Sequence, residues 1–342
     1  MATSQAKSPP DDRLEPKLGP GEMISGYQLE QLVGTGGMGW VYQARHTVSS
    51  RVVAIKVLRE DQVGLDRAVD RMMREAAILA SVAHAGFPRF YECGLLDDGR
   101  PWISMELITG SPLAARMQRG VLTADEVMCF LGSVAEVLAA AHDRGVTHRD
   151  LKPDNIFLTP DDPAFPVRVI DWGIAHHLAG ARFTNMNEAI GTPTYMAPEQ
   201  ARGGPTDGHC DVYGLGVVAY QALVGRPPFM GQTSVEILVQ HLNRPVPALA
   251  PRCPDAPIGL VELIERMLVK NFENRPSALD VRASIAKLRK HACEPCYLHF
   301  SIDDGTGVPV GVHEYNRTPA TAQLRAARVP AELAELADQL DD

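Results

Sequence analysis

The sequence predicts an α+β fold of two lobes: a small β-rich lobe that carries one long helix, and a larger, mainly α-helical lobe. From Tyr27 to Leu107, most of the chain consists of short apolar runs separated by glycine-rich or polar turns, as in strands. Beyond a Gly-Ser-Pro break at Gly110–Pro112, apolar residues recur at helical spacing. The chain has 342 residues, 45% of them hydrophobic, which suffices for a substantial core.

The small lobe is expected to follow a leader, since residues 1–22 are rich in proline and charge and should be disordered. Between the third and fourth predicted strands, Leu65–Val82 has helical spacing. Its apolar face consists of Ala68, Met72, Ala76 and Leu79. The strand-like segments are Tyr27–Val33, Gly39–His46, Val52–Leu58, Phe90–Leu95 and Trp102–Leu107.

The large lobe begins with a well-marked helix. Thr123 is a good N-cap, and Glu126 completes a capping box for a helix that runs to about Arg144. Further helices are predicted over Asp207–Gly225, Ser234–Asn243, Ile258–Val269 and Ala278–Lys290.

The tail, residues 291–342, has no assigned role. Its His291, Cys293, Cys296 and His299 are spaced closely enough to share a zinc ion. One local loop would supply all four ligands, so we favour coincidence.

Composition excludes some classes of function. The net charge is −9, whereas a nucleic-acid-binding face usually makes a chain basic, so no nucleic-acid partner is expected. No run of about 18 apolar residues is present, so no membrane span is predicted, and the N-terminus lacks the pattern of a signal peptide. The six cysteines are scattered, and a reduced, cytoplasmic setting fits best.

A glycine-rich segment opens the small lobe. Gly34, Gly36 and Gly39 have the spacing Gly-x-Gly-x-x-Gly, which lets backbone N–H groups approach phosphates without an intervening Cβ. A plain hairpin turn would look the same. A dinucleotide-binding loop shares the spacing but precedes a helix, whereas a strand is predicted here.

Lys56 stands inside the apolar run Val52–Leu58, where an unpaired charge is costly. It either reaches solvent from an edge strand or binds phosphates beside a carboxylate partner. Glu75, on the following helix, is the natural partner; otherwise it is an exposed helical glutamate.

The segment His148–Asn155 (HRDLKPDN) is the most specific motif, because eight consecutive positions fit one pattern of phosphoryl transfer. Asp150 can accept the proton of a substrate hydroxyl and orient it for in-line attack. Lys152 can neutralise charge on the transferring group, and Asn155 can offer its carbonyl oxygen to Mg²⁺. A simple turn between helix and strand is the alternative, which the full match disfavours.

Asp171 follows the strand-like Val167–Ile170 and supplies a hard oxygen ligand suited to Mg²⁺ that bridges ATP phosphates. Further along, Glu199 needs a cation, and Arg275 is the candidate. The side chain of Asp211 is expected to form hydrogen bonds with the backbone around Asp150.

These motifs, in this order, resemble those of the eukaryotic-like (Hanks-type) serine/threonine protein kinases of bacteria, over about residues 27–288. The resemblance implies the two-lobed protein kinase fold over residues 23–290, with an N-lobe at about 23–108 and a C-lobe at about 109–290. It also implies transfer of the ATP γ-phosphate to protein Ser or Thr hydroxyls, with Mg²⁺ or Mn²⁺. Lys152, two residues after Asp150, fits the serine/threonine pattern, and Thr192 is similar to the family's threonine that bonds the catalytic Asp and Lys.

The resemblance further implies an adenine pocket. Val41 and Ala54 would cover the base from above and Phe157 from below. Met105 would be the gatekeeper, with the Glu106 carbonyl and the Ile108 N–H as hinge partners. The alternative is that all six residues are ordinary core.

Regulation is expected around Arg149, whose guanidinium would gain from an anion. The hypothesised anion is a phosphate on Thr184, added by autophosphorylation between two copies in a homodimer; the alternative is an unmodified Thr184. His176 stands where relatives often carry Arg or Lys, which puts the strength of such a phosphate pocket in doubt. Trp172 replaces the usual Phe after Asp171.

Two other functions are weighed. A pseudokinase scaffold would need a defect in Lys56, Asp150, Asn155 or Asp171, and none is present. A small-molecule phosphotransferase would lack the segment from Thr192 to Glu199.

Overall fold

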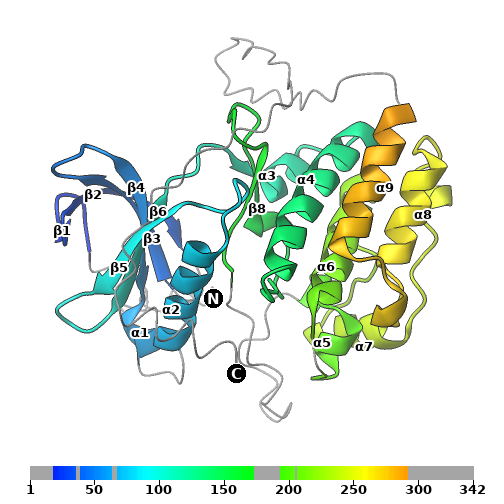
Figure 1. The fold of residues 1–342 in the computed structure, drawn as a ribbon. Helices are drawn as coiled ribbons and strands as arrows, with labels where there is room; N and C mark the ends of the chain where they lie inside the picture. The colour runs from blue at the N-terminus through cyan, green and yellow to red at the C-terminus, as the bar shows by residue number, and fades with distance from the viewer. Residues whose placement is uncertain (1–17, 36–38, 64–67, 173–192, 205, 292–342) are drawn as a thin grey trace, which may run out of the picture. The chain divides into compact units, whose positions relative to one another are not determined.

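The computed structural model describes residues 18–35, 39–63, 68–172, 193–204 and 206–291. In this part of the chain, contacts divide the residues into two compact units (Figure 1). Among the described residues, the first unit consists of 18–76 together with 90–107, and the second of 77–89 together with 108–291. The mixture of a β-rich unit and a mainly helical unit confirms the predicted α+β class.

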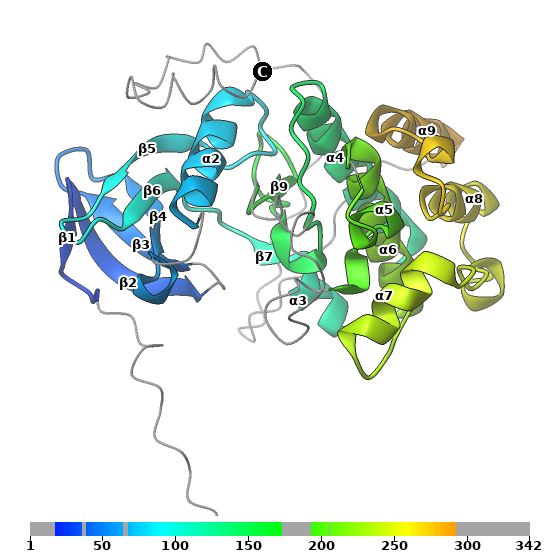
Figure 2. The same ribbon diagram turned by 90° about the horizontal axis from the view of Figure 1, so that it is seen from below.

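The first unit is built on a six-stranded antiparallel sheet with the strand order β1-β2-β3-β4-β6-β5. Helix α1 (Glu60–Val63) follows β4, and α2 (Ala68–Ser81) lies beside the sheet in both views (Figures 1 and 2). The apolar face predicted for this helix is buried, as expected. The strands are β1 (Met23–Ile24), β2 (Tyr27–Thr35), β3 (Gly39–His46), β4 (Val52–Leu58), β5 (Phe90–Leu95) and β6 (Pro101–Glu106).

One face of this sheet carries the core of the first unit. On β3, Trp40, Tyr42 and Ala44 lie opposite Val57, Ile55 and Val53 of β4, and all six side chains are buried in one cluster. Because side chains alternate along a strand, the residues between them project from the other face of the sheet.

The start of the first unit differs from the expectation. Residues 18–22 were assigned to the leader, but they belong to the described structure: Gly21 N–H donates to the Leu29 carbonyl, and Leu29 N–H donates to the Glu22 carbonyl, both at 2.8 Å. Leu18 also packs against the core. A few backbone bonds and one apolar contact thus order residues whose composition resembles that of a disordered segment.

The second unit is mainly helical. Helix α4 begins at the predicted capping box, in which Glu126 N–H donates to Thr123 Oγ1 (3.2 Å) and Thr123 N–H donates to Glu126 Oε2 (2.8 Å). Helix α6 begins after Asp207 and ends at Gly225, whose φ of 82° suits glycine. The helices are α3 (Leu113–Gln118), α4 (Ala124–His142), α5 (Pro198–Ala201), α6 (Gly208–Val224), α7 (Ser234–Asn243), α8 (Ile258–Met267) and α9 (Ala278–His291). None of the described helices has the length and apolar composition that a bilayer crossing requires.

A three-stranded sheet with the order β7-β8-β9 completes the second unit. Its strands are β7 (Ser111–Pro112), β8 (Ile156–Leu158) and β9 (Val167–Val169). The pairing of Ile156 with Val169 brings the end of the His148–Asn155 segment beside the residues that precede Asp171.

Residues 77–89 belong to the second unit, although they lie within the predicted N-lobe. The reason is a set of contacts that the sequence pattern does not reveal. The Val169 N–H donates to the Gly86 carbonyl (2.9 Å), and the Phe87 ring stacks on Trp172 with centroids 4.3 Å apart.

Candidate active site

In the first unit, four of the residues predicted to bind nucleotide share one sheet face. Val41 pairs with Lys56, and Ala54 pairs with Met105. Ala54 and Lys56 are two residues apart on β4, so all four side chains lie opposite the core cluster. Glu106 pairs with Val53, and the role predicted for it involves its carbonyl rather than its side chain.

Lys56 forms an ion pair with Glu75. Lys56 Nζ lies 2.9 and 2.7 Å from the two carboxylate oxygens, and both residues are buried, at 7% and 3% exposure. Strand β4 supplies the cation and α2 the anion. The expected Lys56–Glu75 ion pair is therefore present within the first unit. The alternatives, a lysine that reaches solvent and an exposed helical glutamate, are excluded.

Gly39 is required by the sheet itself. A Cβ at this position would lie 2.5 Å from the Val57 carbonyl oxygen, so a larger residue would push β3 away from β4. Gly34 pairs with Val41, and a Cβ there would make only ordinary contacts. Gly36 lies outside the described residues.

In the second unit, a buried carboxylate holds the backbone before Asp150. Asp211 Oδ2 accepts from His148 N–H (2.8 Å), and its Oδ1 accepts from Arg149 N–H (2.7 Å). His142 Nε2 lies 2.8 Å from Oδ2. Burial disfavours the charge on Asp211, but the hydrogen bond and charge of His142 outweigh it and hold the pKa of this carboxyl below its ordinary value. The hydrogen bonds predicted between Asp211 and the backbone around Asp150 are therefore observed.

The side chains around Asp150 converge. Lys152 Nζ lies 2.8 Å from Asp150 Oδ2, and Asn155 Nδ2 donates to the Asp150 carbonyl (2.8 Å). The carboxyl and ammonium groups are each about a quarter exposed, at 25% and 24%, whereas Asn155 is buried. An accessible carboxylate beside an ammonium group suits proton acceptance from a hydroxyl next to a developing negative charge.

The two predicted metal ligands are brought together by the β8–β9 hairpin. Ile170 N–H donates to the Asn155 carbonyl (3.0 Å), so Asp171 follows directly after a residue bonded to Asn155. The bond from Asn155 Nδ2 to Asp150 fixes the side-chain amide. An amide oxygen and a carboxylate are ligands that Mg²⁺ prefers, and Mg²⁺ commonly completes its shell with water and phosphate oxygens. The donor set thus fits the predicted ion.

Trp172 is fully buried, which its sequence position alone does not explain. It stacks on Phe87 at an interplanar angle of 17°, lies 4.8 Å from the His148 ring, and donates from Nε1 to the Val169 carbonyl (2.8 Å). Asp171 itself has a φ of 61°, a strained value for a non-glycine residue. The indole therefore helps to fix the backbone that carries Asp171.

The remaining predicted residues divide into two groups. Phe157 lies half-buried in β8, Ile108 follows β6 at the start of the second unit, and Arg149 precedes Asp150 with a φ of 66°. Thr184, Thr192 and His176 lie outside the described residues, as do Cys293, Cys296 and His299 of the tail. Within the described residues, no group of three or more His, Cys, Asp or Glu side chains could hold a metal ion.

Glu199 and Arg275 form the predicted ion pair, with two bonds of 2.6 and 2.8 Å. Next to Glu199, the Gln200 side chain donates to the Arg149 carbonyl (2.9 Å) in the segment His148–Asn155, which we call the catalytic loop. The sequence did not predict this contact. A glutamine three residues into a short helix carries no sequence signal of such a role.

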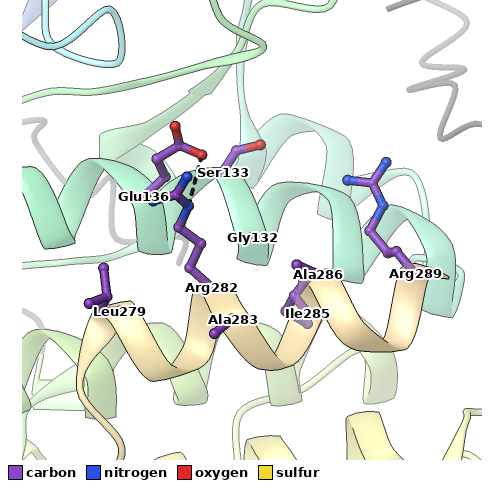
Figure 3. A pocket seen from close by; sticks show the side chains of 9 residues that line it. All are labelled: Gly132, Ser133, Glu136, Leu279, Arg282, Ala283, Ile285, Ala286 and Arg289. Carbon is purple, nitrogen blue, oxygen red and sulfur yellow. Dashed lines mark ion pairs between the residues drawn. The ribbon is translucent and has the colours of Figure 1, made fainter. Parts of the chain in front are cut away.

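A groove also lies on the surface of α4 and α9 (Figure 3). Its lining includes Gly132, Ile285 and the ion pair of Glu136 with Arg282 (3.3 Å). None of the predicted site residues lines it, so it has no part in the chemistry considered above.

Comparisons with known proteins agree with this geometry. The model of the protein kinase domain matches residues 27–285. The chain is 37% identical to the serine/threonine-protein kinase pkn3 of Myxococcus xanthus over 263 residues, which cover 74% of this chain and 48% of that one. It is 37% identical to the serine/threonine-protein kinase PknA of Mycobacterium tuberculosis over 323 residues, covering 90% and 74%.

Among solved structures, the chain resembles the PknI kinase domain of Mycobacterium tuberculosis, with a TM-score of 0.61 and 27% identity over 80% of this chain and 99% of that one. The chain spans about half the length of pkn3 and of the related Pkn1. The catalytic-loop geometry, the domain match and these relatives together show that the chain belongs to the protein kinase family, among the bacterial serine/threonine kinases.

Proposed function

We propose that the chain transfers the γ-phosphate of ATP to Ser and Thr hydroxyls of protein substrates. The observation that carries the proposal is the catalytic loop, in which Lys152 and Asn155 converge on Asp150 while Asp211 holds the backbone. Asp150 would accept the hydroxyl proton and orient the oxygen, and Lys152 would neutralise charge on the transferring group.

ATP with Mg²⁺ or Mn²⁺ would supply the phosphoryl group and the charge that neutralises it. Asn155 and Asp171 would hold the metal ion. Lys56, kept in place by Glu75, would bind the α- and β-phosphates. Val41, Ala54 and Met105 share a sheet face with Lys56, which supports the proposal that they bind adenine. The roles of the Glu106 carbonyl, Ile108 and Phe157 toward adenine stay predictions.

Asp150→Asn is the direct test. Transfer of labelled phosphate from Mg²⁺-ATP to a casein-type acceptor should fall at least about 100-fold, because a general base typically contributes that much. ATP affinity should stay nearly unchanged, since Asp150 orients the acceptor. Asp143→Asn, the same change at an exposed position after α4, is the matched control. Retention of more than about a tenth of wild-type turnover in Asp150→Asn would contradict the assignment.

The same assay tests the acceptor class. Phosphoamino-acid analysis should find phosphoserine and phosphothreonine, and dominant phosphotyrosine would overturn the interpretation of Lys152 and Thr192. A pseudokinase would give no transfer at all in the wild type.

The proposal extends to autophosphorylation at Thr184. Arg149 Nε has no hydrogen-bond partner among the described residues, and burial lowers the pKa of its guanidinium, so an anion would stabilise it. A phosphate on Thr184, added in trans, would supply that anion, with His176 contributing when protonated. Peptide mass mapping should find this phosphate in the wild type and not in Asp150→Asn.

A further inference from the structure

The backbone at Arg149, directly before Asp150, has an unfavourable conformation. Arg149 has a φ of 66°, which a non-glycine residue keeps only where its surroundings hold it. Asp211 fixes the N-terminal side of this residue by accepting from the His148 and Arg149 amides. These two bonds do not involve the Arg149 carbonyl, which is the group next to Asp150. A different residue has to hold that carbonyl.

Gln200 supplies that contact. Its Nε2 donates to the Arg149 carbonyl at 2.9 Å, and its Oε1 accepts from the Ala197 N–H at 3.0 Å. The side chain is itself anchored, because the neighbouring Glu199 is bound through both oxygens to the buried Arg275. The amide of Gln200 therefore links a fixed segment to the backbone that carries Asp150.

We infer that Gln200 is a positioning residue for Asp150, acting through the Arg149 carbonyl. The inference rests on the proposed function. The neutral amide of Gln200 provides both the donor for this carbonyl and the acceptor for the Ala197 N–H. Glutamate keeps the acceptor but cannot donate when ionised, and leucine does neither. Loss of the donor releases one side of the Arg149–Asp150 peptide and widens the range of orientations that Asp150 samples.

Two variants isolate this role. Gln200→Glu removes the donor and keeps the length of the side chain, whereas Gln200→Leu removes the donor without a charge that could attract the Arg149 guanidinium. Gln240→Glu is the matched control, because Gln240 Nε2 likewise donates to a backbone carbonyl, that of Met230, from the exposed surface of α7.

In both Gln200 variants, kcat for phosphorylation of a casein-type acceptor should fall about tenfold, as expected for the loss of one hydrogen bond that orients a reacting group. KM for ATP should change by less than about twofold, because Gln200 acts on the acceptor side. Melting temperatures should match that of Gln240→Glu. A Gln200→Leu variant whose kcat stays within about twofold of the wild type overturns the inference, whatever Gln200→Glu does.

Amide hydrogen exchange gives a readout that does not depend on activity. In Gln200→Leu, exchange from His148 to Leu151 should become faster, while exchange in α6 stays as in the wild type. Unchanged exchange in this loop also overturns the inference. If the wild type transfers no more phosphate than Asp150→Asn, the proposed function fails, and the exchange result alone then decides whether Gln200 holds the loop.

Discussion

Two buried ion pairs, one in each unit, are built differently. In the first unit, Lys56 and Glu75 join a strand to a helix over 19 positions of sequence. In the second, Glu199 and Arg275 join segments 76 positions apart. The Arg275 guanidinium also donates to the carbonyls of Val269, His209 and Lys270, at 2.6, 3.0 and 3.1 Å, and lies 4.8 Å from the centre of the Tyr213 ring.

This difference indicates different roles. A guanidinium is planar and has several donors in fixed directions, so it suits a permanent contact between segments of the fold. An ammonium is a compact charge on a flexible side chain, so it suits a phosphate of a ligand. We therefore expect the Glu199–Arg275 pair to stabilise the fold and the Lys56–Glu75 pair to serve catalysis.

The largest expected effect is the loss of stability in Arg275→Met. The substitution leaves Glu199 buried without its cation and three carbonyls without a donor, which should cost about 3–5 kcal/mol of unfolding free energy. Denaturant titration measures it. Arg282→Met is the matched control, since Arg282 pairs with Glu136 on the surface (Figure 3), with side-chain exposures of 46% and 31%. That change should cost less than about 1 kcal/mol. Equal losses in the two variants would refute the structural role of Arg275.

The sequence predicted the Lys56–Glu75 pair because a charge inside an apolar run demands a counter-charge, and it pointed to Arg275 as the candidate cation for Glu199. It did not predict the three carbonyls around Arg275 or the bond from Gln200 to Arg149, since both depend on tertiary contacts between distant segments. The same limit applies to residues 77–89, whose place in the second unit depends on the stacking of Phe87 against Trp172.

Local motifs were more predictable than packing. The helices with clear caps, such as α4 after Thr123 and α6 after Asp207, begin where expected. The short α3 was missed because it starts directly after the Gly110–Pro112 break and spans only six residues. In the catalytic loop the residues predicted to do the chemistry are close together in sequence, so the sequence alone predicts Asp150, Lys152 and Asn155 as one site.

The next effect concerns catalysis. Lys56→Met should lower kcat/KM about 100-fold, because it removes a charge aimed at the phosphates, and Glu75→Ala should lower it by a smaller factor. The losses should not add in the double variant, since the two residues act as one pair. Arg45→Met, which breaks the exposed pair with Glu30 on the same sheet, is the control. Additive losses of kcat/KM in the double variant would mean that Glu75 is not the partner of Lys56. A loss of unfolding free energy as large as in Arg275→Met would mean that the Lys56–Glu75 pair stabilises the fold as much as the Glu199–Arg275 pair does.

The smallest expected effect is a pH dependence of the unfolding free energy, which arises next to the Glu199–Arg275 pair. The ring of Tyr213 lies beside Arg275, its hydroxyl lies 2.9 Å from His241 Nδ1, and His241 is fully buried. Burial, assisted by the charge of Lys270, lowers the pKa of His241 from 6.5 to about 4. Between these two values the unfolded chain binds a proton that the folded chain does not, so stability falls as the pH drops through this window.

From about pH 7.5 to about pH 5, the wild type should lose about 1–2 kcal/mol of unfolding free energy through this one group. His241→Gln removes the titration and should show a correspondingly smaller loss over the same range, measured by denaturant titration at both pH values. Lys270 contributes little to this loss, because burial and Arg275 lower the pKa of its ammonium group only to about 8, so the group stays mostly protonated in both states over this range. If the wild type and His241→Gln lose equal stability, His241 is not the group that makes the second unit sensitive to acid, and its burial against Tyr213 carries no penalty for protonation.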